Sequence, residues 1–160
     1  MPIEAFLIPA FNKVLTTALG EGIDLAKNSS ETRNLRRLMR QRLTRETKLN
    51  SELMNYQQLT VDQRVSAITT EAIDFIMSQP LPLEVFFDME PWDDFTFHDA
   101  ANDSHTIWSM SIKSERELVE RWWHRVRLAK IRQDAGVSSG DFEYLSLLCR
   151  VLHSTLKDRD

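Results

Sequence analysis

The side chains best suited to bind a metal ion are concentrated in one acidic stretch, DMEPWDDFTFHDAANDSH, residues 88–105. Carboxylate oxygens and imidazole nitrogens are ligands for divalent cations, and a bound cation can activate water for hydrolysis. The candidate ligands are His98, Asp99, Asp103 and His105. Four further acids suit a basic partner equally well: Asp88, Glu90, Asp93 and Asp94. We favour an acidic docking surface with no metal or cofactor, and keep a metal-dependent hydrolase as an alternative.

Nucleophilic catalysis has little support in this sequence. Cys149 is the single cysteine, and it falls at an apolar position of the last expected helix, where a thiol behaves as a small buried hydrophobe. His153 follows four residues later, but no orienting group or oxyanion donor accompanies the two. The sequence contains neither a glycine-rich phosphate loop nor a G-x-S-x-G elbow. A non-enzymatic role is therefore favoured.

The segment RNLRRLMRQRLTRETK, residues 33–48, holds six arginines and one lysine against a single acid. At about 100° per residue, several of these bases cluster on one side of a helix. This expected ridge consists of Arg33, Arg37, Arg40 and Lys48. If the helices pack side by side, a later helix extends it with Arg121, Arg125 and Arg132. Arginine binds carboxylates and phosphates, so the ridge predicts an acidic protein partner or, alternatively, nucleic acid.

The same helix carries a seam of apolar residues at alternating spacings of four and three, as in a coiled coil. Its apolar members are Leu35, Met39, Leu49, Leu53 and Tyr56. Arg42 and Glu46 fall within this seam, four residues apart, so they can pair along the helix. A charged pair inside an apolar seam is expected to fix register or partner choice.

Length and composition indicate what kind of protein carries these sites. The chain has 160 residues and a net charge of −4, although residues 80–105 contain seven acids and no lysine or arginine. This length suits one domain, residues 1–160. No apolar run reaches the roughly 20 residues of a membrane span, and no secretory signal is visible at the N-terminus. A single cysteine excludes an internal disulfide, so we expect a cytoplasmic protein.

Helical periodicity accounts for most of the chain. Apolar residues repeat across residues 3–19, which predicts an amphipathic helix packed in the protein's own core. The basic helix is expected to continue to about Tyr56. Thr60 and Gln63 match a capping box that opens a third helix, which ends before Pro80.

A second capping box, Ser114 with Glu117, opens the fourth helix, and Gly136 provides its end. The last helix begins near Asp141. Before the fourth helix, residues 83–112 are rich in aromatic and β-branched side chains, which favours a small antiparallel β-meander or, at its start, an extended loop. The expected fold is mainly α: a single domain of about five helices with an acidic loop or strand insert at about residues 80–112.

Together these patterns favour a non-enzymatic intracellular interaction protein: an accessory subunit, adaptor or regulator. It would dock through the basic helix ridge and the acidic aromatic loop, to another protein or to a second copy in a homo-oligomer. If ridge and loop meet within one molecule, the ridge is masked. The alternatives are a nucleic-acid-binding accessory factor using the arginine-rich helix, and a metal-dependent hydrolase at the acidic His/Asp loop.

Overall fold

The computed structural model describes residues 9–16, 20, 22, 29–87, 112–137 and 142–158. These residues are mainly helical, as the periodicity predicts. After a helical stretch at residues 9–16, the helices are α3 (Ser30–Met54), α4 (Val61–Ala67), α5 (Glu71–Met77), α8 (Glu115–Asp134) and α9 (Phe142–Asp158). None of the helices in these ranges is long and apolar enough to cross a membrane.

The expected β-meander can be compared with the structure only at its start. Leu83–Val85 forms a short 3₁₀ helix, η1, in place of a strand or an extended loop. Residues 88–111, which make up most of the expected insert, lie outside the described residues.

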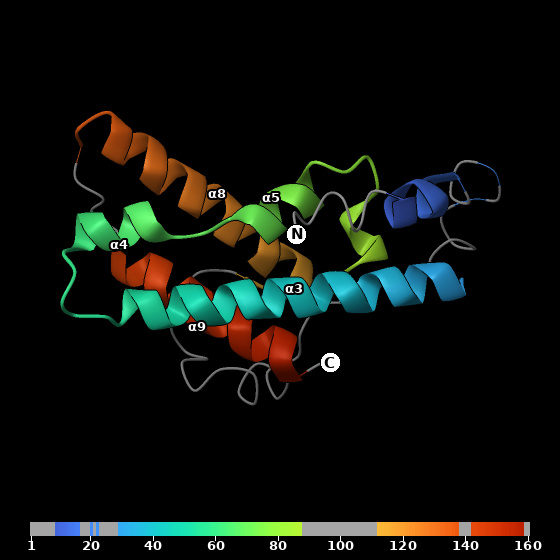
Figure 1. The fold of residues 1–160 in the computed structure, drawn as a ribbon, viewed down its shortest axis with the longest axis horizontal. Coiled ribbons are helices and arrows are strands. Elements are labelled where there is room, and N and C mark those ends of the chain that lie inside the picture. Colours follow the sequence, from blue (N-terminus) through green and yellow to red (C-terminus); the bar gives the residue numbers. More distant parts are fainter. Residues whose placement is uncertain are drawn as a thin grey trace.

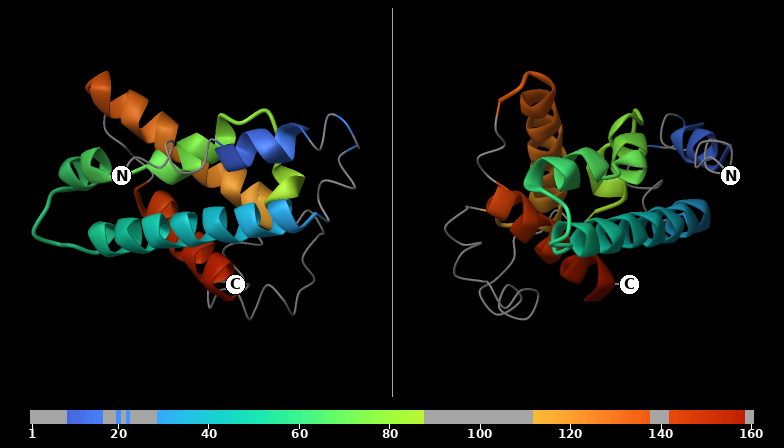
Figure 2. Two further views of the ribbon diagram at one scale, coloured as in Figure 1. Left: turned by 45° about the vertical axis from the view of Figure 1, so that its right-hand side comes forward. Right: turned by 60° about the vertical axis from the view of Figure 1, so that its left-hand side comes forward.

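α3 is the long axis of the molecule, and the other helices are arranged around it (Figure 1). α9 crosses α3 and also packs against α8, so it connects α3 and α8, the two longest of the described helices. α4 and α5 lie along the other side of α3, and α4 also contacts α8 (Figure 2). This arrangement leaves one long side of α3 without a covering helix among the described elements.

The core is one apolar cluster to which every described helix contributes. From the first helical stretch, Phe11 and Val14 are buried in it. The Phe11 ring meets Phe75 edge-on at 5.0 Å between centroids and lies 5.3 Å from Phe86. The described part of this helix therefore packs in the protein's own core, as predicted.

Two helices begin at the caps that the sequence predicts. The Thr60 hydroxyl accepts from the Gln63 N–H at 3.1 Å, and the Gln63 side chain accepts from the Thr60 N–H at 2.9 Å. At α8, Ser114 accepts from the Glu117 N–H at 3.2 Å. α8 ends before Gly136, whose φ of 76° is readily adopted by glycine.

The expected third helix is broken, and this prediction was wrong in that respect. Two side chains of α3 hold the break between α4 and α5. Asn50 accepts from the Thr69 N–H at 3.0 Å and donates to the Thr69 carbonyl at 2.9 Å. Glu46 accepts from the N–H groups of Ala72 and Ile73, at 2.8 and 3.2 Å, and so caps α5. The helix can be interrupted between α4 and α5 because these two side chains form hydrogen bonds with the backbone groups that the break leaves without helical partners.

The expected seam of α3 is wrong in its second half. Leu49 and Tyr56, placed in the seam by spacing, are 57% and 50% exposed. The buried stripe instead runs through Leu35, Met39, Leu43, Glu46, Asn50 and Met54. Its steps are mostly of four residues, because α9 crosses α3 and does not supercoil with it.

Candidate functional site

The open side of α3 carries four exposed bases: Arg33, Arg37, Arg45 and Lys48, here called the basic face. Arg37 donates to the Asn34 side chain at 2.8 Å, which leaves its charge uncompensated. The ion pairs of the described residues lie elsewhere, so no carboxylate in that part of the chain neutralises any of the four. The basic face is therefore a row of positive charges along one helix that no ion pair with a described residue compensates.

Arg40 does not belong to this face, which corrects the expected ridge. It is 8% exposed, and its guanidinium forms an ion pair with Glu115 in the first turn of α8. Arg40 Nη1 also reaches the Phe86 carbonyl at 3.5 Å. Glu115 is completely buried, and a buried carboxylate requires a cation and hydrogen bonds to remain charged. Arg40 is thus a structural partner of Glu115 and is not available to bind phosphate.

Arg36, to which the sequence analysis gave no role, lies beside Arg40. Its Nε donates to the Val85 carbonyl at 2.8 Å. Burial, followed by the neighbouring charges of Arg40 and Arg33, lowers the pKa of Arg36 below its usual value. Two arginines of one helix therefore hold consecutive carbonyls, at residues 85 and 86, against α3.

The expected Arg42–Glu46 pair is also corrected. Both carboxylate oxygens of Glu46 bind the start of α5, and the described residues contain no ion pair between Glu46 and Arg42. Burial raises the pKa of Glu46 to about 7, against the opposing effect of its two backbone hydrogen bonds. Glu46 thus acts within the molecule, and Arg42 lies half-buried on the flank of α3.

The arginines of α8 do not extend the basic face. Arg121 donates to the Tyr144 hydroxyl at 2.7 Å, and the Arg125 guanidinium lies 5.0 Å from the centre of the same ring. Tyr144 belongs to α9, so both arginines serve the contact between α8 and α9. Arg132, in the last turn of α8, is half-buried.

Cys149 is buried at the apolar position that the sequence predicts. Burial, with a smaller contribution from the charge of Glu46, raises the pKa of the thiol to about 12. The thiol donates to the Thr47 carbonyl at 3.3 Å, and His153 Nδ1 lies 3.5 Å from the Thr47 hydroxyl. A thiol with such a pKa stays protonated near neutral pH and is a poor nucleophile.

The acidic stretch lies outside the described residues, so the docking and hydrolase interpretations of it stay predictions. This concerns the docking acids Asp88, Glu90, Asp93 and Asp94, and the metal candidates His98, Asp99, Asp103 and His105. Within residues 9–16, 29–87, 112–137 and 142–157, no group of histidine, cysteine and acidic side chains could hold a metal ion.

Sequence reasoning missed two members of the open surface, Arg45 and Leu49. Leu49 is exposed next to Lys48, and Tyr56 is exposed just beyond the end of α3. The missed signal was Leu43, four residues after Met39, which shifts the buried stripe and turns Leu49 outward. Of the residues exposed here, tyrosine and arginine are the types that are enriched at protein–protein interfaces.

Comparison of the chain with protein-family models, curated proteins and solved structures gave no match.

Proposed function

We propose that this chain is a non-enzymatic interaction protein that docks onto an acidic protein surface through the basic face of α3. The observation that supports this most directly is the row of four exposed bases without an acidic partner in the described part of the chain. Such a row attracts an anionic surface before contact and raises the rate of association. The attraction is local to this face, because the chain as a whole carries a net charge of −4.

The apolar neighbours of the basic face favour a protein partner over nucleic acid. Leu49, which follows Lys48, and Tyr56, just beyond the end of α3, each expose half or more of their surface. Burying the exposed part of such a side chain against a partner contributes about 1–2 kcal/mol. The phosphate backbone of a duplex offers no apolar surface for this purpose, whereas an acidic protein surface with apolar residues offers both kinds of contact.

The partner in this proposal is another protein or a second copy of the chain. Two basic faces repel each other, so a two-fold contact through α3 alone is unfavourable. A second copy would instead bring its acidic stretch, residues 88–105, to the basic face in a head-to-tail contact. In either case the role is that of an accessory subunit, adaptor or regulator.

Nucleic acid is the alternative partner. Three of the four bases are arginines, whose planar forks bind phosphate with two parallel hydrogen bonds. Binding of this kind is strongly weakened by salt, because counterions are released from the phosphate backbone. Salt dependence with DNA and RNA therefore distinguishes this alternative.

The test compares two variants of equal charge. One changes Arg33, Arg37 and Arg45 to Gln, and the control changes the exposed Lys113, Arg127 and Lys157 to Gln. Each brings the net charge from −4 to −7. Fluorescence anisotropy with a labelled polyglutamate peptide, DNA and RNA is measured at low and near-physiological salt. We expect the peptide to bind wild type and the control variant, and to be released by the α3 variant.

Three results would count against the proposal. If the peptide does not bind wild type, an acidic protein partner is excluded. If both variants lose peptide binding equally, the binding depends on net charge and not on the basic face. Tight, salt-sensitive binding of DNA or RNA that only the α3 variant loses would move nucleic acid to first place. Sedimentation of wild type over a range of concentrations then tells a second copy from another protein.

A further inference from the structure

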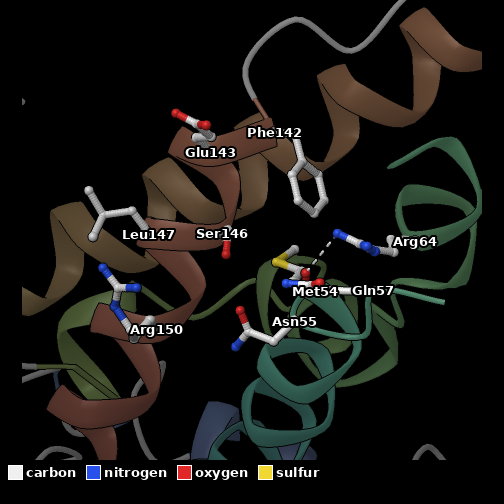
Figure 3. A pocket seen from close by; sticks show the side chains of 9 residues that line it. All are labelled: Met54, Asn55, Gln57, Arg64, Phe142, Glu143, Ser146, Leu147 and Arg150. Carbon is white, nitrogen blue, oxygen red and sulfur yellow. Dashed lines mark hydrogen bonds between the residues drawn. The ribbon is translucent and has the colours of Figure 1, made fainter. Parts of the chain in front are cut away.

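A pocket of about 430 Å³ lies between the end of α3, the middle of α4 and the first turns of α9 (Figure 3). Its volume falls within the range of pockets that bind small molecules, roughly 300–1,000 Å³. None of the residues that line it belongs to the basic face. The pocket is therefore a separate feature, and what it binds is independent of the docking proposal.

Arg64 of α4 is held in place on one side of this pocket. Its Nη1 donates to the Met54 carbonyl at 3.3 Å, and its guanidinium lies 5.6 Å from the centre of the Phe142 ring. Arg64 is half-buried, and its Nε is buried without a hydrogen-bond partner. No carboxylate of the described residues pairs with it. A partly desolvated cation without an anion carries a free-energy cost that a bound anion offsets.

A second cation, Arg150 of α9, lies on the opposite side of the pocket in Figure 3. Between the two arginines lie Ser146, one turn earlier on α9, and Asn55, at the end of α3. A hydroxyl and an amide there supply hydrogen-bond donors between two positive charges. Glu143 also lines the pocket, so its lining carries two cations against one acid.

The remaining lining gives the pocket a preference beyond charge. Phe142 and Leu147 form apolar surface on α9, next to the arginines. A ligand that carries an apolar body as well as charge would bury more surface than an inorganic ion. The chemistry of the lining therefore selects an organic anion.

We infer that this pocket binds a small organic anion with two or more negative charges, of the phosphate-ester or polycarboxylate class. One charged group binds at Arg64, and the molecule extends past Ser146 and Asn55 toward Arg150. Its body lies against Phe142 and Leu147. The two arginines thus lie on either side of one ligand that carries at least two negative charges.

Titration calorimetry of the full chain with phenyl phosphate, citrate, inorganic phosphate and neutral benzyl alcohol tests this. The variants are Arg64→Gln and Arg150→Gln, with Arg45→Gln on the basic face as the matched control. We expect phenyl phosphate or citrate to bind, and each pocket variant to weaken binding about tenfold or more, because each removes a charge-assisted hydrogen bond. Arg45→Gln should leave the affinity unchanged, and amide NMR shifts should centre on Asn55 and Ser146.

The relative affinities of phenyl phosphate and citrate identify the ligand class within these two. The inference is overturned if none of the anions binds at millimolar concentration, or if Arg45→Gln weakens binding as much as Arg150→Gln does. It is also overturned if benzyl alcohol binds as well as phenyl phosphate. If Arg64→Gln fails to fold, Arg150→Gln decides alone, because Arg150 is an exposed residue of α9.

Discussion

The two sides of α3 contain the same kinds of residue and use them differently. On the open side, Arg33, Arg37 and Arg45 are exposed and have no acidic partner among the described residues. On the inner side, Arg40 and Glu46 are buried, and each contacts another element of the fold. A charged side chain that is buried next to a partner stabilises the fold, whereas an exposed one can bind another molecule. Four variants can break or sharpen this difference.

Replacing Arg40 with alanine has the largest expected effect. It leaves the buried Glu115 carboxylate without its cation, which is expected to lower the free energy of unfolding by about 3–5 kcal/mol. Urea denaturation at neutral pH measures this change. The matched control, Arg37→Ala on the open side, should change stability by less than about 0.5 kcal/mol. Equal effects of the two substitutions would refute the distinction between the two sides of the helix.

Glu46 should make stability depend on pH. Burial raises its pKa from 4.5 to about 7, so the folded protein binds a proton more tightly than the unfolded chain does. The stabilisation is fully present below pH 4.5 and is lost as the pH rises through about 7. By linkage its full size is about 3 kcal/mol.

Denaturation of wild type and Glu46→Gln from pH 4.5 to 8 measures this contribution. The neighbouring Glu71 and Asp74 are present in both proteins, so the difference between the two curves reports Glu46. Wild type should lose stability relative to the variant as the pH rises. Parallel curves would mean that the pKa of Glu46 is not raised, and the exposed Glu52→Gln serves as the control.

Asn50→Ala should cost about 1–3 kcal/mol, because it removes the hydrogen bonds that hold the backbone of Thr69 between α4 and α5. Thermal or urea unfolding measures this loss. The control is Asn55→Ala, an exposed asparagine whose side chain donates to the Ser51 carbonyl at 3.1 Å. A loss no greater than that of the control would show that the break between the two helices does not depend on Asn50.

The smallest effect on stability is expected for the open side. Changing Arg33, Arg37 and Arg45 together to Gln should alter the free energy of unfolding by less than about 1 kcal/mol, because these side chains make no ion pair with a described carboxylate. Urea denaturation measures it. A loss of several kcal/mol would show that the basic face supports the fold and is not free for a partner.

Those features of the fold that depend on nearby residues could be predicted from the sequence. The caps at Thr60 and Ser114 are fixed by residues three positions away, and the buried Cys149 follows from the apolar pattern of its own helix. Such signals lie within one or two helical turns. These local signals were sufficient to predict the mainly helical fold class and most helix boundaries.

The errors have a common physical origin in distant partners. Arg40 is buried because of Glu115, which lies 75 residues away, and the third helix breaks because of Asn50, 19 residues before Thr69. Periodicity contains no information about which polar side chain will meet which buried group. The pocket at Arg64 was missed for the same reason, since α4 and α9 meet there only in the folded chain.

The position of Arg40 has a consequence for how this chain can be altered. One guanidinium contacts the Phe86 carbonyl and the Glu115 side chain, so a single residue holds together the two described segments that end at residue 87 and begin at residue 112. Loop-closure entropy changes by only about 0.6 kcal/mol for each doubling of loop length. Replacing residues 88–111 with a shorter or longer linker is therefore expected to cost little loop-closure entropy, because Arg40 already contacts the described residues on both sides of it.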